Sequence, residues 1–361
     1  MEGSVVAEEN VPLGTRCSLG VGGPARRYVS ALTVDEAADV LRSSMEDNDP
    51  VLVLGAGTNV VISDDGWPGT VLHLADYRLD LRREQGRALL QVGAGVEWDE
   101  LVAFAVTEGY QGIECLSGIP GTVGAAPIQN IGAYGAELSE TLVKVEVLER
   151  ASLERLWLDA SALGLGYRTS LFKSAWRDRY LITAVELSLA IGGRCTPRYA
   201  ELRDALGGKD RVPPSAARQA VLHLRKRKSM LLRPEDPNAR SVGSFFTNPC
   251  LTPEELALLM GGLTDDEAAS LPRWPTADGR TKVAAAWLVE RAGFGKGFTL
   301  GHAGLSSAHS LAIINRGNAL ASDIIALASI IRRQVRQRFG VTLDAEPTFL
   351  GFQRPTDLLL G

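Results

Sequence analysis

The segment 322–339 carries apolar residues at spacings of three and four, which is the period of one helical face. They are Ile324, Leu327, Ala328, Ile331 and Val335. Ser322 stands where an N-cap would, and Gly340 follows the last turn. The pattern predicts that this is the clearest amphipathic helix of the chain.

Shorter helical patterns are predicted at 33–42, 97–108, 211–230 and 281–293. The first begins with a capping box, because Glu36 follows Thr33 by three residues. Gly109 follows the second, and a glycine also closes the last. The third follows a proline pair and ends in a basic run. Residues 1–14 read as a loose tail.

Runs of β-branched and apolar residues predict strands at 70–75, 88–96, 142–149, 179–190 and 341–352. A further run, 51–63, reads as strand, glycine turn and strand. Strands and helices mix without the regular alternation of a doubly wound sheet. The predicted fold class is therefore α+β.

The stretch 117–138, SGIPGTVGAAPIQNIGAYGAEL, fits neither period. It has five glycines and two prolines, and no charged residue before Glu137. Glycine and proline break helices, and the stretch is too polar at Gln129 and Asn130 to cross a membrane. Glycine-rich backbone offers N–H groups that a ligand can approach closely, which is how many proteins bind phosphate.

Length and composition limit the possible classes. A chain of 361 residues is long for one core and suggests two or three domains. The net charge of −5 gives no global basic field for nucleic acid, so the run Arg225–Lys228 is read as a solvated helix end. The four cysteines lie far apart without a CxxC pair, which argues against a zinc site or a disulfide framework.

The N-terminal residues MEGSVVAEENVPLG include acidic side chains and no apolar core, so no signal peptide is expected. No run approaches the roughly 20 apolar residues of a membrane span. We therefore expect a cytoplasmic protein with no membrane partner.

Pairs of glycines in the pattern GxG occur at Gly20/Gly22, Gly55/Gly57, Gly93/Gly95 and Gly164/Gly166. A dinucleotide fingerprint requires a strand before the pattern and a helix after it. Gly20 has neither flanking element, and the residues after Gly55 continue as strand. The context disfavours a Rossmann site, and for Gly20 and Gly93 a tight turn is favoured.

The turn 55–59 and the stretch 117–138 form a stronger combination. Both are rich in glycine, and both carry side-chain amides, at Asn59, Gln129 and Asn130. Together they could clamp a pyrophosphate between two small domains.

Five motifs in this order resemble the UDP-N-acetylenolpyruvoylglucosamine reductase family. They are GAGTNVVISD, SGIPGTVGAAPIQNIGAYGAEL, GYRTSLFK, GSFFTNP and AEPTFLG. The resemblance runs from about residue 14 to residue 352, and five motifs in order are specific where one would be weak.

The resemblance implies an FAD-binding fold of the vanillyl-alcohol-oxidase (PCMH) type with two α+β subdomains and a third domain for the sugar nucleotide. The expected boundaries are 1–75, to which 345–361 returns, then 76–225 and 226–344. FAD is expected to be noncovalent. By similarity its binding residues are Gly55, Ala56, Gly57, Thr58, Asn59, Ser117, Gly118, Ile119, Pro120, Gly121, Thr122, Gly124, Ala125, Gln129, Asn130, Gly132, Ala133, Tyr134 and Gly135.

The implied reaction is the NADPH-dependent reduction of UDP-N-acetylglucosamine enolpyruvate to UDP-N-acetylmuramate, a step of peptidoglycan synthesis and so of cell-wall growth, cell shape and division. Ser244 is placed like the family's general acid, which protonates the enol intermediate. Arg168 and Glu346 match the pair that polarises the substrate carboxylate. A guanidinium suits charge that builds on a carboxylate, and a positioned hydroxyl can protonate a basic carbon.

Each of these residues also has a structural reading. Ser244 could be a turn cap, Arg168 a surface ion pair and Glu346 a pairing group near the chain end. The family motifs favour the catalytic reading. The substrate-binding residues implied by the resemblance are Tyr167, Tyr199, Lys228, Asn248 and His309. No metal is expected, and the protein is expected to be a monomer.

Two other functions remain open from the sequence. A flavin oxidase of the same fold would take electrons from a sugar or alcohol and return them to oxygen. A non-catalytic protein that binds flavin or nucleotide sugar would show no turnover. The presence of all three motif residues favours the reductase.

Overall fold

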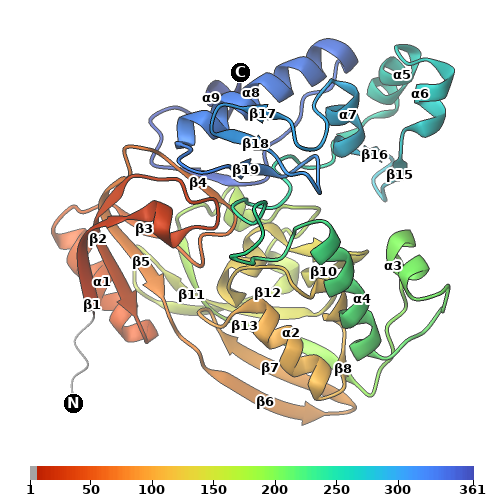
Figure 1. Cartoon of the computed structure of the whole chain (residues 1–361). Helices are drawn as coiled ribbons and strands as arrows, with labels where there is room; N and C mark the ends of the chain where they lie inside the picture. The colour runs from red at the N-terminus through yellow and green to blue at the C-terminus, as the bar shows by residue number, and fades with distance from the viewer. Residues whose placement is uncertain (1–5) are drawn as a thin grey trace. The chain divides into compact units, whose positions relative to one another are not determined.

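The computed structural model describes residues 6–361, drawn in Figure 1. These residues form two compact units. The first comprises the chain up to Val11 together with Ala25–Gly57 and Trp67–Leu231. The second comprises Pro12–Pro24, Thr58–Gly66 and Leu232–Gly361. The glycine turn 55–59 therefore crosses a boundary, because one unit ends at Gly57 and the other resumes at Thr58.

A four-stranded sheet begins the first unit, in the order β1-β2-β5-β3. Its strands are β1 (Val6–Pro12), β2 (Pro24–Ala31), β5 (Trp67–Leu74) and β3 (Val51–Val53). β5 runs parallel to both β2 and β3. Helix α1 (Val34–Glu46) packs Ala37 and Leu41 against Val29 and Leu72. The predicted N-cap at Thr33 is confirmed, since its hydroxyl accepts the Glu36 N–H.

The prediction of a loose tail at 1–14 was wrong for the part of it that the structure describes. Residues 1–5 lie outside the described residues. The rest forms β1 and the 3₁₀ turn η1 (Leu13–Arg16). β1 lies at the edge of its sheet. Edge strands often carry charged side chains, so its acidic residues gave no strand pattern in the sequence.

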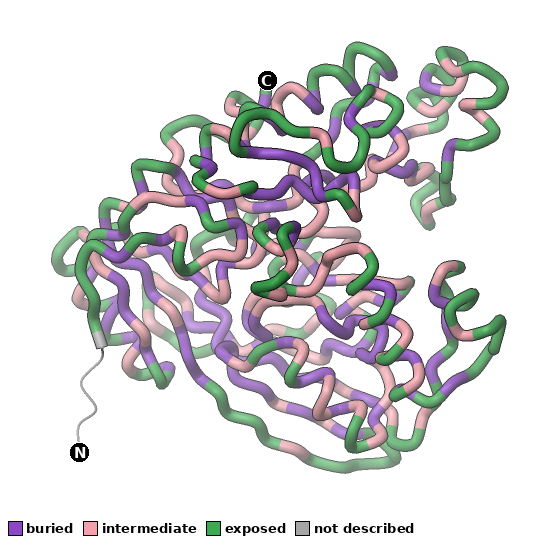
Figure 2. Tube along the Cα trace, viewed as in Figure 1, coloured by how far each residue is buried: buried purple, intermediate pink, exposed green. Residues whose placement is uncertain are grey.

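A six-stranded antiparallel sheet is the larger part of the first unit, with the order β12-β11-β13-β7-β6 and β8 paired to β13. Its strands are β12 (Arg155–Asp159), β11 (Leu142–Glu149), β13 (Tyr180–Ile191), β7 (Arg87–Gly93), β6 (Leu79–Glu84) and β8 (Tyr110–Gln111). Central β13 is buried along most of its length, whereas edge strand β6 is exposed, as Figure 2 shows.

Helices α2 (Trp98–Thr107) and α4 (Pro214–Arg227) join the core of this sheet through Trp98, Leu101 and Val221. The glycine-rich stretch lies in the same core. It contains η3 (Val123–Gln129) and the two-stranded β9 (Gly132–Ala133) and β10 (Ala136–Glu137), and it follows η2 (Glu114–Leu116). The remaining short helices of this unit are α3 (Ala200–Ala205), η4 (Leu138–Glu140), η5 (Ala160–Ala162) and η6 (Leu171–Lys173).

The second unit is built on helix α8 (Ala321–Phe339), which packs on a three-stranded sheet of β17 (Thr299–Leu300), β18 (Ala303–Leu305) and β19 (Ile313–Asn315). A second small sheet has the order β14-β16-β15. The other elements are β14 (Cys250–Leu251), α5 (Pro253–Gly261), α6 (Asp265–Ser270), β15 (Arg273–Pro275), β16 (Thr281–Val283), α7 (Ala285–Arg291) and α9 (Thr356–Leu360). Strand β20 (Thr348–Leu350) pairs in parallel with β4 (Val60–Ile62).

Two predicted helix starts were wrong. Helix α8 begins at Ala321 and not after Ser322, because the Asp64 carboxylate accepts the N–H groups of Ala321 and Ser322 at 2.6 and 3.1 Å. A cap supplied from so far along the chain leaves no local signal. The predicted helix 281–293 begins instead as β16, whose backbone pairs with β14 and β15.

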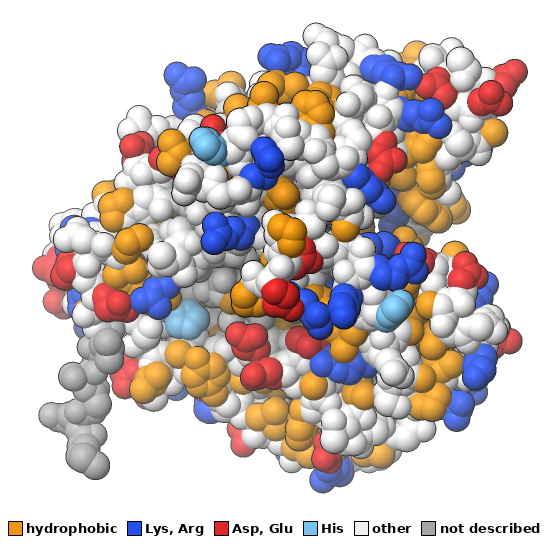
Figure 3. Space-filling view, in the orientation of Figure 1, with side chains coloured by type: hydrophobic (Ala, Val, Ile, Leu, Met, Phe, Trp, Pro, Cys, Tyr) orange, Lys and Arg blue, Asp and Glu red, His pale blue; other side chains and the backbone are white. Residues whose placement is uncertain are grey.

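No helix within residues 6–361 is long and apolar enough to cross a lipid bilayer. On the face drawn in Figure 3, lysine and arginine side chains occur together with acidic ones. That mixture agrees with the net charge of −5 and gives no support to a nucleic-acid interface on this face.

Candidate active site

The two glycine-rich loops lie against each other in the first unit. A Cβ placed on Gly55 would lie 2.9 Å from the Thr122 hydroxyl oxygen and 3.7 Å from the Ala125 methyl. Any side chain at position 55 would therefore push the loops apart. The sequence prediction that these loops act together agrees with this geometry.

Backbone donors remain open in the first loop. The N–H groups of Gly55, Ala56 and Gly57 donate to no backbone carbonyl within residues 6–361. In the second loop, Gly118, Gly121 and Gly135 hold positive φ angles of 71°, 128° and 81°, which L side chains rarely adopt. A close-approach surface with open N–H groups fits a phosphate-bearing cofactor such as FAD.

The start of the second loop is fixed by charged side chains. The Gly118 N–H donates to the Asp99 carboxylate at 2.6 Å, and the Gly118 carbonyl accepts from the buried Arg225 guanidinium at 3.0 Å. Arg218 donates two further bonds to Asp99, of 2.5 and 2.9 Å. Burial alone would raise the pKa of the Asp99 carboxyl, but Arg218 and the Gly118 N–H hold it below its ordinary value.

Some predicted cofactor residues use their side chains within the loop. The Asn130 amide donates to Glu137 and to the Gly166 carbonyl and accepts the Ser139 N–H, and the residue is 1% exposed. The Ser117 hydroxyl donates to the Glu114 carbonyl at 2.6 Å. These side chains hold the shape of the loop, so any contact with FAD would come from their backbone.

Arg168 lies against the far end of the same stretch. Its guanidinium donates to the Gly132 carbonyl at 2.6 Å and stands over the Tyr167 ring, 5.5 Å from the ring centroid. The Arg168 backbone has a φ of 55°, an uncommon conformation for a residue with a side chain. The local backbone thus directs the guanidinium back onto the glycine-rich stretch.

Tyr199 and Lys228, two predicted substrate contacts, meet around Tyr134. The Tyr134 and Tyr199 rings pack edge to face at 5.7 Å, and the Lys228 ammonium lies 5.9 Å from the Tyr134 centroid. Burial raises the pKa of Tyr134 to about 12, so its hydroxyl stays protonated and can donate a hydrogen bond. Lys228 also forms an ion pair with Glu201, which the sequence analysis did not single out.

In the second unit Ser244 lies beside Phe245, whose backbone bonds to two other segments. On one side the Phe245 N–H donates to the Leu311 carbonyl at 2.8 Å. On the other side the Glu346 N–H donates to the Phe245 carbonyl at 2.8 Å, and Phe246 bridges to Ala345. The fold therefore brings together Ser244 and Glu346, two residues more than a hundred positions apart.

The Ser244 hydroxyl oxygen lies 2.9 Å from Nε2 of His309, and both side chains are partly buried. Asn248, another predicted substrate contact, accepts the Ala285 N–H at 2.9 Å and so caps helix α7. Asn59 donates to the Glu346 carbonyl at 3.5 Å, and its own carbonyl accepts the Thr348 N–H. The predicted site residues thus form two groups, one in each unit.

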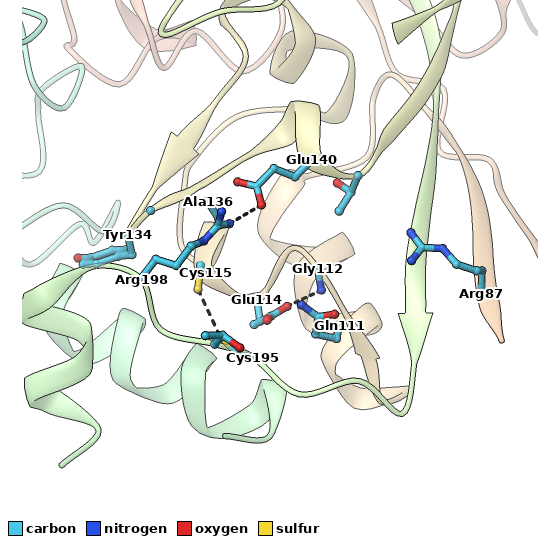
Figure 4. Close-up of a pocket in the computed structure, with 13 residues that line it drawn as sticks. Arg87, Gln111, Gly112, Glu114, Cys115, Tyr134, Ala136, Glu140, Cys195 and Arg198 are labelled. Atoms are coloured by element: carbon cyan, nitrogen blue, oxygen red, sulfur yellow. Dashed lines mark hydrogen bonds and ion pairs between the residues drawn. The ribbon is translucent and has the colours of Figure 1, made fainter. Parts of the chain in front are cut away.

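A cavity of about 140 Å³ in the first unit is lined in part by Tyr134 and Gly135 of the glycine-rich stretch (Figure 4). On its wall the Cys115 and Cys195 sulfurs lie 3.6 Å apart beside Glu114. The Cys115 sulfur and burial raise the pKa of the Cys195 thiol, so that thiol stays protonated. These two thiols are 80 positions apart in the sequence and still lie side by side, and all four cysteines are free thiols.

Sequence reasoning missed Asp99, Arg218 and Glu201, which position the predicted residues. Asp99 lies in the first turn of a predicted helix, where an acidic residue is ordinarily explained by the helix dipole. Nothing local distinguishes it from such a residue. Its role becomes visible only when the fold places Gly118 and Arg218 beside it.

Comparison with known proteins adds two family matches. Residues 25–152 match an FAD binding domain, and residues 235–350 match the C-terminal domain of UDP-N-acetylenolpyruvoylglucosamine reductase. The chain is 45% identical over 348 residues to the UDP-N-acetylenolpyruvoylglucosamine reductase of Thermobifida fusca, covering 95% of this chain and 97% of that one. With that of Streptomyces coelicolor it is 43% identical over 350 residues, covering 95% and 90%.

Among solved structures, the UDP-N-acetylenolpyruvylglucosamine reductase of Thermus caldophilus superposes with a TM-score of 0.64 at 26% sequence identity, covering 96% of this chain and 98% of that one. The loop geometry and the domain match define an FAD-binding oxidoreductase, and the predicted α+β fold of the vanillyl-alcohol-oxidase type is confirmed. The chain belongs to the UDP-N-acetylenolpyruvoylglucosamine reductase family.

Proposed function

We propose that the chain reduces the enolpyruvyl ether of UDP-N-acetylglucosamine to UDP-N-acetylmuramate, with NADPH as the hydride donor and Ser244 as the acid. Flavin-dependent reduction of this kind in peptidoglycan synthesis follows from membership of the family. The donor, the residue roles, the cytoplasmic location and a monomeric state are the proposal.

The glycine-rich loops would hold FAD, and the bound cofactor would supply the transfer of a hydride from NADPH to the alkene of the enolpyruvyl group. The protein must then manage two charges. Negative charge builds on the substrate carboxylate as the hydride arrives, and the neighbouring carbon must receive a proton. The site therefore needs one group that stabilises the carboxylate charge and another that donates the proton, and neither group should react with the flavin.

The observation that carries the proposal is the placement of Ser244 beside Glu346. The backbone of the next residue, Phe245, is bonded on both sides, and the Ser244 hydroxyl oxygen lies 2.9 Å from Nε2 of His309. A serine is a weak acid in water, but a fixed hydroxyl can protonate a basic carbon at close range. Ser244 supplies the proton, and Glu346 orients the substrate carboxylate.

Arg168 supplies the positive charge. A guanidinium binds a carboxylate through two parallel N–H bonds, and that pairing strengthens as the carboxylate gains charge. Its bond to the Gly132 carbonyl ties it to the stretch that would hold FAD. Tyr199, Lys228 and the Tyr134 ring offer an aromatic and cationic surface suited to the diphosphate and sugar.

The direct test is the visible flavin band of the purified protein. Added NADPH should bleach it without oxygen, and the enolpyruvyl UDP sugar should restore it with formation of UDP-N-acetylmuramate. Bleaching by a plain alcohol with rapid return in oxygen would instead indicate an oxidase. Ligand binding without any change of the band would indicate a non-catalytic binding protein.

A further inference from the structure

Ser244 has one side-chain neighbour whose role the reaction has not used. His309 lies in the loop between β18 and β19, and its Nε2 is 2.9 Å from the Ser244 hydroxyl oxygen. The loop is itself fixed, because the Ala312 N–H donates to the His309 carbonyl at 3.1 Å and the Phe245 N–H to the Leu311 carbonyl. The imidazole and the hydroxyl therefore belong to one rigid arrangement.

The direction of this hydrogen bond decides what His309 can do. A hydroxyl carries a single proton. If Ser244 donated that proton to Nε2, the proton would point away from the substrate carbon, and the serine could not act as the acid. An acid at this position requires the reverse: Nε2 carries a hydrogen and donates it, and the serine proton stays available to the substrate.

We propose that His309 is a positioning residue for Ser244, and that its Nε2–H donates to the Ser244 hydroxyl oxygen. This rests on the proposed function of Ser244 as the acid. The histidine aims the serine proton at the substrate and stabilises the alkoxide left after the transfer. Its role is opposite to that of a histidine that removes a proton from a serine nucleophile.

The proton balance of the step is simple. The bond from the Ser244 oxygen to hydrogen breaks as the carbon–hydrogen bond forms on the substrate, and the charge left on oxygen faces the Nε2–H. The oxygen then recovers a proton from water. The substrate has gained one hydride and one proton, and the serine ends neutral. A donor aimed at a developing oxyanion contributes about 10²- to 10³-fold to rate in related cases.

The test replaces His309 in the complete FAD-containing protein and follows the two half-reactions separately. In His309→Ala, bleaching by NADPH should keep its wild-type rate, and reoxidation by the enolpyruvyl UDP sugar should slow by about 10²-fold. In His309→Gln, an amide N–H replaces the Nε2–H, and reoxidation should be at least about tenfold faster than in the alanine variant. His302→Ala, an exposed histidine of the same region, should match the wild type.

A second arm asks whether His309 acts through Ser244. In a Ser244→Ala background, His309→Ala should cause no further loss of the reoxidation rate. An additional loss there would overturn the positioning role. So would an alanine variant that is reoxidised as fast as the wild type, or a glutamine variant as slow as alanine, because a restored N–H donor would then bring back no rate. Wild-type reoxidation in the same series checks the proposed function on its own.

Discussion

Arg168 combines an uncommon backbone conformation with a side chain that turns back onto the glycine-rich stretch. Its φ of 55° is one that most residues with a side chain avoid, and such positions persist where the surrounding structure holds them. The hydrogen bond from the Arg168 guanidinium to the Gly132 carbonyl helps to stabilise this conformation. The side chain is thus prepared before any substrate arrives.

Replacing Arg168 by lysine keeps the charge and the backbone preference but removes the planar pair of donors. We expect Arg168→Lys to bleach normally with NADPH and to be reoxidised by the enolpyruvyl UDP sugar about 10²-fold more slowly. Stopped-flow absorbance of the flavin measures both steps. Arg177→Lys, an exposed arginine nearby, is the control, and an equal rate in both variants would contradict the role of Arg168.

At this scale the sequence motifs predicted Ser244, Arg168 and Glu346 as site residues, because each has a distinctive neighbourhood along the chain. They did not reveal the bond from Ser244 to His309, which joins residues 65 positions apart. Nor did they reveal that Asn130 and Asn248 use their side chains to hold a loop and a helix end. The identity of an asparagine in a motif does not show whether its amide contacts a ligand or the protein backbone.

The glycine-rich stretch depends as an element on the contacts at its start. Asp99 joins the Gly118 N–H to Arg218, and its pKa lies below the ordinary value. A carboxyl with a lowered pKa in the folded protein adds stability above its unfolded pKa of about 4, and that stability is lost as pH falls through the folded value.

Asp99→Asn should therefore destabilise the protein near neutral pH by about 1 kcal/mol, a low value for bonds to a charged group because Asp99 is partly exposed. The difference in Tm from the wild type should shrink as pH falls below about 4. Thermal unfolding across pH measures it. Asp39→Asn, which removes an exposed ion pair, should show no difference, and a pH-independent loss in Asp99→Asn would contradict the account.

Gly124 marks a tight approach within the second loop. A Cβ there would lie 2.5 Å from the Ala94 methyl carbon, and alanine has no flexible end to move away. We expect Gly124→Ala to cost about 1–3 kcal/mol and to lose FAD during gel filtration. Gly295→Ala, where no atom lies within 4 Å, is the control. A Gly124→Ala protein with wild-type FAD content and Tm would show that the loop is not held this closely.

Element types were predictable where a pattern was long, and element ends were not. The helical period over 322–339 correctly indicated α8, but its cap comes from Asp64, which lies far along the chain. The strand β16 reads as helix because TKVAAAW has good helix formers, and only its pairing with β14 and β15 makes it extended. The tail that became β1 is polar because it lies at a sheet edge.

At the scale of the whole molecule, neither unit is a continuous stretch of the chain. Residues 12–24 and 58–66 belong to the unit that is otherwise formed by the C-terminal part, and β20 pairs with β4. Such exchanges leave no mark in composition. The buried clusters nonetheless follow the units, since those that contain Trp98 and Leu72 belong to the first unit and the one that contains Phe245 and Phe246 belongs to the second.

The proposed roles fall on residues of both units. Arg168 and the glycine-rich stretch lie in the first, and Ser244, Glu346 and His309 in the second. We propose that the first unit provides most of the cofactor-binding residues and the second unit the proton. Ser244 supplies that proton, while reduction by NADPH needs no such group.

The most direct measurement is anaerobic stopped-flow absorbance of the Ser244→Ala protein with FAD bound. It should bleach with NADPH at the wild-type rate, and on mixing with the enolpyruvyl UDP sugar its flavin band should return at least about 10²-fold more slowly than in the wild type. Ser322→Ala, an exposed serine of the same unit, should behave as the wild type in both steps. Wild-type recovery of the band in Ser244→Ala would contradict the claim.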